Sequence, residues 1–341
     1  MLILVWFSGY CRLRDLKQLG LTYLVYPGAV HTRFEHSIGV YWLAGETINR
    51  INIDQGFELE IDHFDIQTVK LAGLLHDVGH GPFSHLFEKD FLPQVLHSNK
   101  WSHEEMSLKM IDYIVDEHNI EIESDVVRRV KVNFLKPLDT MRVIGDEICY
   151  RAKEYLTIHK LFSSRADLHR TVYSHAKVKA IDFMLVDALV KANNHLDIKS
   201  CIDDPAEYWK LDDSIVKFIE TSKSEELKES RDLIRRIRRR DLYLFCNEFT
   251  VPKDQLEYFK DITPQDIICS QDYESDEKFP IPDEKISLLL PECYQDKIVR
   301  VYSKKPELVE VVSDAFENFQ VKNYGMKTQV HGTPQKKRQR K

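Results

Sequence analysis

The segment from Leu71 to His85 carries the densest group of side chains able to bind a metal or transfer a proton. An apolar run leads directly into a histidine–aspartate pair, and two further histidines follow within a turn rich in glycine. Five of the 14 histidines of the chain could line one pocket together with one aspartate and one arginine. These residues are His36, His76, His80, His85 and His103, with Asp77 and Arg33.

Neutral imidazoles beside a carboxylate suit divalent ions such as Mn, Fe, Co or Zn, whereas an oxygen-only set favours Mg or Ca. Adjacent helical residues point about 100° apart, so His76 and Asp77 can share an ion only near a helix end, and His36 is the natural third ligand. A bound metal would activate water and polarise a phosphoryl oxygen, while histidines shuttle protons. With Arg33 bracing phosphate oxygens, these residues predict metal-assisted phosphoester or phosphoanhydride hydrolysis.

Each of these residues has a plainer interpretation. A lone buried histidine is usually a satisfied core group, and His36 taken alone would be one. The segment from His76 to His85 differs, because polar side chains beside glycine turns fill a core poorly. The arginines between Arg235 and Arg240 are expected to form a solvated helical face, with anion binding as the alternative.

Apolar residues recur at the helical period in the first two-thirds of the chain, which predicts a mostly α-helical body. The expected helices span residues 33–51, 64–75, 102–116, 178–192, 207–219 and 224–240. Gly79, Gly81 and Pro82 should end the helix that carries His76 and Asp77, because glycine frees the backbone and proline cannot continue the ladder.

Beyond residue 261 the pattern changes to an acidic, turn-rich stretch, a strand at 297–302 and a helix at 307–319. We therefore expect a divergent N-terminus (1–11), a helical domain (12–261), a smaller α+β lobe (262–331) and a basic, disordered tail (332–341). The tail is either a solvated end or a nuclear-import or polyanion-binding signal.

The composition limits the location and the partners of the protein. Its formal charge of −7 argues against a chain-wide nucleic-acid binder, and six cysteines without a C-x-x-C pair indicate a reducing compartment. The apolar start at Met1 lacks a basic region and a cleavage site, so we expect no secretion and no membrane anchor. We expect a nuclear protein, with the cytoplasm as the alternative.

Residues 33–36, 71–85 and 101–104 resemble the HD-domain phosphohydrolases and, more narrowly, the SAM-and-HD-domain deoxynucleoside triphosphate triphosphohydrolases. Residues 141–155 are most similar to plant members, and no SAM domain is expected before the likeness begins at Arg12. The resemblance implies a mainly α fold, an HD-domain helical bundle with a smaller C-terminal α+β lobe. It also implies cleavage of a dNTP to deoxynucleoside and triphosphate.

The resemblance also implies roles for individual residues. The ligands of a divalent metal (Fe, Mn, Zn or Mg) would be His36, His76 and Asp77. The catalytic residues around the α-phosphate, one of them a proton donor, would be His80, His85 and His103. The substrate-binding residues would be Gln18 and Leu19 at the sugar, Arg33 at phosphate, and Arg165, His169 and Tyr173. An allosteric GTP or dGTP site, linked to homo-oligomer assembly, would be lined by Arg151, Lys153 and Arg240.

The chain departs from the family pattern in three places. The segment that carries the family's fourth metal ligand, an aspartate, is expected to be deleted near 132–140, and neither Asp139 nor Asp146 has the context to replace it. The lobe is shortened near 271–275, and the usual lead-in to Arg12 is missing. These losses suggest a splice product or an imperfect gene model, and we expect at best a feeble hydrolase.

Two other functions remain open at this stage. The chain could be a catalytically silent partner that joins oligomers of the full-length enzyme or binds single-stranded nucleic acid. It could instead be an HD phosphodiesterase acting on nucleoside monophosphates or cyclic nucleotides, which the match of residues 18–19 and 165–173 to the triphosphohydrolases disfavours.

Overall fold

The computed structural model describes residues 7–96, 101–120, 141–144, 147–251, 266–267 and 298–325. The chain divides into two compact units, Met1–Asp241 and Leu242–Lys341. The division precedes the boundary expected near residue 262, because a strand that begins at Leu244 pairs with one that begins at Ile298. The fourth-ligand region at 132–140, Asp139, Asp146, the shortened stretch at 271–275 and the basic tail lie outside the described residues.

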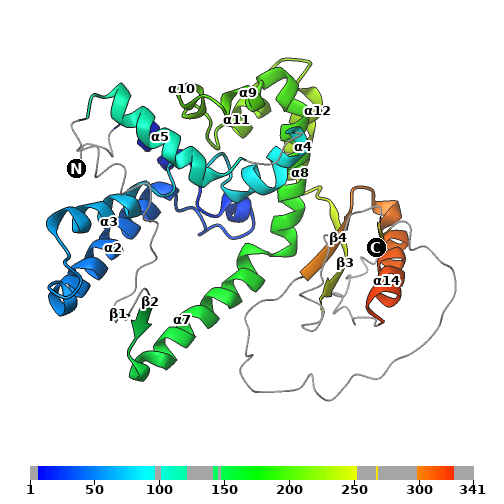
Figure 1. Ribbon diagram of the computed structural model, residues 1–341. Helices are drawn as coiled ribbons and strands as arrows, with labels where there is room; N and C mark the ends of the chain where they lie inside the picture. Colours follow the sequence, from blue (N-terminus) through cyan, green and yellow to red (C-terminus); the bar gives the residue numbers. More distant parts are fainter. Residues whose placement is uncertain are drawn as a thin grey trace. The chain divides into compact units, whose positions relative to one another are not determined.

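A helical hairpin forms the first part of the larger unit, in which α2 (Arg33–Gln55) packs against α3 (His63–Leu75). Figure 1 shows the two helices side by side. Each begins at a capping box: the Thr32 N–H donates to the Glu35 carboxylate at 2.9 Å, and Asp62 exchanges similar bonds with Asp65. Such caps satisfy amide groups that the first helical turn leaves without partners.

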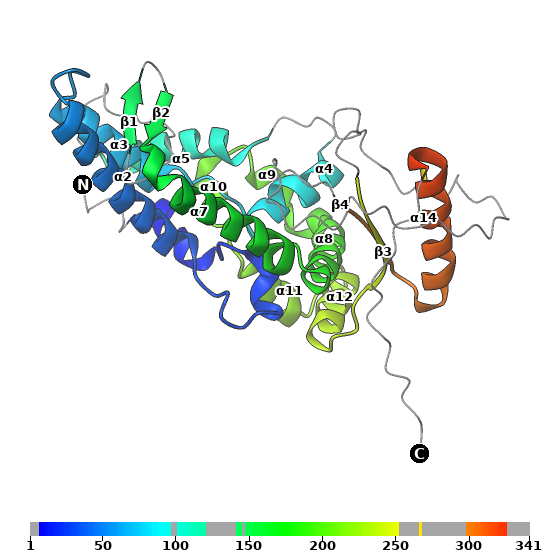
Figure 2. The same ribbon diagram turned by 90° about the horizontal axis from the view of Figure 1, so that it is seen from below.

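Helix α8 (Ala176–Leu196) is the central element of this unit, and α12 (Lys228–Arg238) packs along it (Figure 2). Its buried apolar residues include a series at intervals of three or four positions, from Val178 through Ile181, Leu185 and Leu189 to Ala192, as expected for a helix with one face in the core. The buried apolar residues of α8 are Val178, Ala180, Ile181, Met184, Leu185, Val186, Ala188, Leu189 and Ala192. α12 contributes Ile234 and Ile237 to the same core.

Shorter elements complete the larger unit. They are α1 (Ser8–Cys11), η2 (Arg12–Asp15), η3 (Gly20–Leu24), the π-helical η4 (Phe87–Phe91), α4 (Leu92–Val95), α5 (His103–Glu117), α9 (Ile198–Cys201), α10 (Pro205–Tyr208) and α11 (Ile215–Thr221). The helix expected over 207–219 is therefore two short helices, because a turn follows Tyr208 and Asp212 accepts the Ser214 N–H at 2.7 Å.

Two features of the larger unit were not predicted from the sequence. Strands β1 (Met141–Ile144) and β2 (Glu147–Tyr150) form an antiparallel hairpin, and the Gln55 side chain bonds both the N–H and the C=O of Val143. After η5 (Ala152–Glu154), helix α7 (Tyr155–Leu168) leads into the π-helical η6 (His169–Tyr173), and neither contains a buried residue.

In the smaller unit, β3 (Leu244–Thr250) pairs antiparallel with β4 (Ile298–Ser303), and α14 (Val309–Tyr324) packs against both strands after η9 (Pro306–Leu308) (Figure 1). Phe249, Phe316 and Phe319 are the large members of its core. The strand and helix expected at 297–302 and 307–319 are confirmed, as is the mainly α fold with a small α+β lobe. None of the described helices is both long and apolar enough to cross a bilayer.

Candidate metal centre and active site

The structure brings together His36, His76 and Asp77, the three residues expected to hold a metal. One candidate ligand atom from each lies within 4.8 Å of the other two. His36 Nε2 stands 3.5 Å from Asp77 Oδ2, and His76 Nε2 stands 3.2 Å from Asp77 Oδ1. His36 comes from the first turn of α2, whereas His76 and Asp77 follow the last residue of α3.

The helix end makes this convergence possible. α3 ends at Leu75, before the glycines that were expected to stop it, and His76 is its C-cap. The His76 Nδ1 contacts the Gly73 carbonyl oxygen at 2.9 Å. A ring held at Nδ1 in this way presents Nε2 to Asp77, which is how metal-binding histidines are usually oriented.

Arg33 occupies the other side of Asp77. Its Nη1 donates to Asp77 Oδ2 at 2.5 Å and its Nε donates to Ser84 Oγ at 2.8 Å. The side chain is only 2% exposed, so a phosphate contact by Arg33 would have to use the guanidinium hydrogens that these two bonds leave free. Asp77 Oδ1 lies beside His76 and His80 and is not bonded to Arg33, so it is the better candidate for a metal ligand.

The donor set fits a divalent transition metal. Ligands bound to one ion at about 2.0–2.2 Å stand roughly 3.0–3.5 Å apart, which matches the separations of Asp77 from both imidazoles. Two histidines and one carboxylate form a set that proteins use for iron with open coordination positions. The residues present therefore fit such an ion with three ligands.

A second cluster adjoins the first and contains His80, His85 and His103. The rings of His80 and His103 stack at 3.8 Å with 21° between their planes. Because ring-nitrogen lone pairs lie in the ring plane, two stacked imidazoles cannot both point at an ion between them. This geometry suits proton transfer and hydrogen bonding better than metal binding.

Glu88, which sequence reasoning missed, orients the second cluster. Its Oε2 lies 2.8 Å from His103 Nδ1 and 3.7 Å from His85 Nδ1. Its position three residues after His85, within a helical segment, was the available signal, because such residues share a helix face.

Burial and the Arg33–Asp77 pair determine the protonation states in both clusters. Burial opposes the ionisation of Asp77, but the hydrogen bond from His80 and the charge of Arg33 outweigh it and hold the Asp77 pKa well below its usual range. Burial lowers the pKa of His80 far below that of free histidine. Burial also lowers the pKa values of His36 and His85, and the charge of Arg33 contributes at His85. The site thus combines a fixed anion with neutral imidazoles, as metal binding requires.

Distant segments hold the turn between the clusters in place. Arg12 donates to the Val78 carbonyl oxygen at 3.0 Å, and the Tyr208 hydroxyl donates to that of Gly79 at 2.8 Å. Ser107 on α5 accepts the Gly79 N–H at 2.9 Å. A Cβ on Gly79 would come within 2.1 Å of the Ser107 nitrogen, so glycine permits this close approach.

The predicted sugar-binding turn lies beside the histidine turn. The Ser84 hydroxyl donates to the Lys17 carbonyl oxygen at 2.8 Å, and Gly20 packs on the Phe83 backbone. Gln18 adjoins Lys17, and its Oε1 is buried without a hydrogen-bond partner in the described structure. Such an acceptor is able to take a hydrogen bond from a ligand, and the expected roles of Gln18 and of Leu19 next to it stay predictions.

Three further predicted binding residues, Arg165, His169 and Tyr173, come from α7 and η6. Arg165 on α7 and His169 on η6 are both exposed. The ring centroids of His169 and Tyr173 are 4.8 Å apart. In the part of the chain that the structure describes, none of the three contacts either cluster. The expected allosteric residues Arg151 and Lys153 are exposed at η5, and Arg240 donates to the Leu24 carbonyl oxygen.

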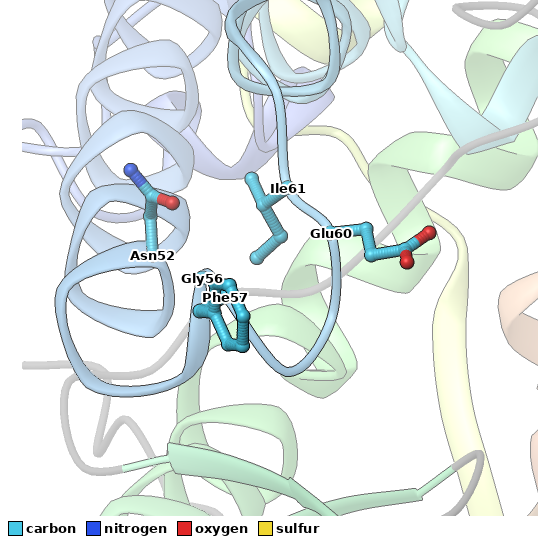
Figure 3. Close-up of a pocket in the computed structure, with 5 residues that line it drawn as sticks. All are labelled: Asn52, Gly56, Phe57, Glu60 and Ile61. Carbon is cyan, nitrogen blue, oxygen red and sulfur yellow. The ribbon is translucent and has the colours of Figure 1, made fainter.

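A hollow at the far end of α2 is separate from this site (Figure 3). It is lined by Asn52, Gly56, Phe57, Glu60 and Ile61. Asn52 follows His36 by sixteen residues on the same helix, which places them roughly 24 Å apart along its axis. The hollow therefore does not adjoin the histidines.

The HD domain family model matches residues 33–170, a range that contains every residue of both clusters. The deoxynucleoside triphosphate triphosphohydrolase SAMHD1 homolog of Dictyostelium discoideum is 34% identical, covering 92% of this chain and 76% of that protein. This chain belongs to the SAMHD1 family of HD-domain proteins. The SAMHD1 protein of Danio rerio is 30% identical, over 87% of this chain and 67% of its own length. The SAMHD1 protein of Homo sapiens is 27% identical, over 86% of this chain and 66% of its own length.

The family alignments also show that this member is shorter than its relatives in the matched region. The match to the Dictyostelium protein runs over 394 residues, more than the 341 residues of the whole chain. That relative therefore has residues within the matched region that lack a counterpart here. This finding agrees with the internal deletions expected from the sequence.

Proposed function

We propose that this protein is a metal-dependent dNTP triphosphohydrolase that hydrolyses a dNTP to a deoxynucleoside and inorganic triphosphate. The observation that carries the proposal is the convergence of His36, His76 and Asp77 beside a second, separately oriented histidine cluster. The names of the relatives support the substrate class. The composition of the metal cluster supports a divalent ion, of which iron, manganese or zinc best suits the donors.

The residues of the chain divide the work between the two clusters. A metal held by His36, His76 and Asp77 would supply a Lewis acid and an activated water. Arg33 holds the Asp77 carboxylate in its charged form and orients it. Gln18 would accept a hydrogen bond from a donor group of the substrate; phosphate oxygens are acceptors, so a sugar hydroxyl is the fitting partner.

His85 and His103 are the better candidates for delivering a proton to the leaving oxygen. His80 contacts Asp77 at 3.4 Å and its side chain is almost fully buried, so His80 is suited to orienting the Asp77 carboxylate rather than to donating a proton to the substrate. His103 is bonded to Glu88, and His85 is half-exposed beside it. A carboxylate that accepts from one ring nitrogen fixes which nitrogen faces the substrate.

The number of metal ligands supports a second candidate, an impaired enzyme that acts as a partner of a full-length relative. The cluster supplies three donors from the described residues, and the alignment shows that this chain lacks residues its relative has. Loss of one ligand typically weakens metal binding strongly. Such a chain would bind nucleotide or join oligomers without rapid turnover.

One experiment separates the two candidates. The purified chain is dialysed against Fe²⁺ or Mn²⁺, its metal content is measured, and triphosphate release from dGTP and from dGMP as a control is followed. One bound metal per chain with release of triphosphate from dGTP supports the enzyme. Metal-free protein that binds dGTP without releasing triphosphate supports the partner, and hydrolysis of dGMP would contradict both.

A further inference from the structure

Asp213, which precedes α11, joins two turns that are far apart in the sequence. Its Oδ2 accepts the N–H of Lys17 at 2.9 Å, and its Oδ1 accepts the N–H of Phe83 at 2.6 Å. Both carboxylate oxygens are therefore used on backbone groups of the site rather than on solvent. The Asp213 N–H donates to the Asp15 carbonyl oxygen at 3.2 Å, which adds a third hydrogen bond, to the segment just before Lys17.

Each of the two turns carries a part of the site. Lys17 is followed by Gln18, whose Oε1 is the buried acceptor without a partner. Phe83 lies between His80 and His85. The carboxylate of Asp213 thus links the backbone of the turn that carries Gln18 to the backbone of the turn that carries His80 and His85.

The histidine turn needs such a support because its backbone is strained. Phe83 and Ser84 have φ values of +59° and +60°, in the left-handed region that non-glycine residues disfavour. Conformations of this kind persist only where surrounding contacts hold them. The bond from Phe83 to Asp213 and the bonds of Ser84 to Arg33 and Lys17 are those contacts.

We propose that Asp213 is a positioning residue that holds the Gln18 turn and the His80–His85 turn at the separation needed for both to engage one nucleotide. The proposal deepens the proposed function and rests on it for the identity of the ligand. Asp213 acts through backbone groups and contacts none of the three candidate metal ligands. Its loss should therefore weaken nucleotide binding while leaving the metal in place, because displacement by about 1 Å can cost 10²-fold in function.

Two substitutions at Asp213 should weaken nucleotide binding to different extents. Asp213→Ala removes both acceptors, whereas Asp213→Asn keeps one carbonyl oxygen and turns an NH₂ group toward the other N–H. Amide hydrogen exchange should accelerate at both Lys17 and Phe83 in the alanine variant, and at one of them in the asparagine variant. We expect KM for dGTP to rise about tenfold in Asp213→Ala, with a smaller change in kcat, an unchanged metal content and an intermediate KM for Asp213→Asn.

Two control variants separate positioning from general destabilisation. Asp212→Asn removes the same charge from the neighbouring residue, whose carboxylate caps only the local Ser214 N–H, and should leave KM and exchange at Lys17 and Phe83 unchanged. Ile234→Ala destabilises the α8–α12 core away from both turns. The proposal is overturned if Ile234→Ala lowers Tm as much as Asp213→Ala does and raises KM for dGTP by the same factor. It is also overturned if the amides of Lys17 and Phe83 stay protected from exchange in Asp213→Ala.

The positioning role of Asp213 can also be tested if the protein proves not to be a hydrolase. If the unmodified chain, loaded with metal, releases no triphosphate from any dNTP, the hydrolase proposal is wrong. Equilibrium binding of dGTP then replaces KM. Weaker binding in Asp213→Ala than in Asp212→Asn supports the positioning role, and equal binding contradicts it.

Discussion

Asp77 is the residue on which the charges of the site converge. Arg33, His36, His76 and His80 all place a nitrogen within 3.5 Å of its carboxylate. Its side chain is almost fully buried, so these groups replace the solvation that the carboxylate loses. Asp77 therefore has two roles, as a candidate metal ligand and as the counter-ion of a buried arginine.

The second role predicts a large stability effect in the absence of metal. Asp77→Asn leaves the Arg33 guanidinium buried without an anion, and breaking a buried pair costs about 3–5 kcal/mol. Urea denaturation in EDTA measures this loss. Asp54→Asn is the control, because Asp54 pairs with Arg50 on the exposed side of α2 at 3.3 Å and should cost less than about 1 kcal/mol. Equal losses in the two variants would refute the counter-ion role.

Asp213 predicts a pH dependence of its own. Removal from solvent raises its pKa to about 6 from an ordinary value of 3.8, against the opposing effect of its two backbone N–H bonds. Between about pH 4 and 6 the folded chain therefore binds more protons here than the unfolded chain. The stability contributed by this carboxyl group is complete below pH 4 and declines as the pH rises through 6.

Comparison with Asp213→Asn isolates this contribution, since the asparagine does not titrate. The unfolding free energy of the unmodified chain minus that of the variant should be larger at pH 4 than at pH 7. Urea denaturation across this range, in EDTA, provides the measurement. A difference that stays constant or grows with pH would show that the folded pKa is not raised.

At the scale of elements, the first turn of α5 packs directly on the turn that follows α3. A Cβ on Gly79 would lie 2.1 Å from the Ser107 nitrogen and 2.3 Å from the His103 carbonyl oxygen. Both atoms belong to the backbone of α5, so neither can rotate away. This contact sets the position of His103 relative to His80.

Gly79→Ala should therefore separate the two elements and reduce stability by about 1–3 kcal/mol or more, with loss of His103 from its cluster. Gly39→Ala is a matched control, because Gly39 lies on the exposed face of α2 with no atom within 4 Å of an added Cβ. It should be neutral or stabilise the chain by up to about 1 kcal/mol. Thermal unfolding of both variants tests the pair, and a Gly79→Ala protein as stable as Gly39→Ala would contradict the close packing.

The elements that sequence reasoning found are those with an apolar face in a core. α3 and α5 were predicted within a residue or two of their observed ends, whereas α8 is longer than predicted at both ends. α7 escaped notice because Leu156 and Phe162 face outward and form no buried stripe. The β1–β2 hairpin also escaped, since strands of four residues are too short for alternation to register and Gln55, far along the chain, binds their backbone.

The candidate site was likewise predicted only in part from the sequence. The types and spacing of the histidines made the metal cluster predictable, because few other functions need them together. Glu88 and Asp213 were not predictable in this way, since each acts through a contact formed only when distant segments meet. Arg33 was expected at phosphate, and only the structure shows that it is paired with Asp77.

At the scale of the whole molecule, the two histidine clusters lie in one compact unit, and the chain is shorter than its relative across the matched region. A cluster of three donors leaves more coordination positions to solvent than a cluster of four. The described residues supply three donors, and the fourth, an aspartate, remains a prediction for the segment missing near 132–140. Because loss of even a group that supports a metal ligand costs about 10–100-fold in affinity, restoring a fourth ligand should raise metal affinity by at least about tenfold.

A chimaera tests this directly. The sequence predicts a missing ligand segment near 132–140, so residues of the Dictyostelium relative that have no counterpart here are inserted between Pro137 and Met141. This insertion should raise both metal affinity and dGTP turnover by about tenfold or more. The control is the same insertion with its aspartates changed to asparagine, which restores chain length without carboxylates. If the control gains as much as the chimaera, the missing residues contribute packing rather than a ligand. If neither gains, the prediction of a missing ligand near 132–140 is wrong.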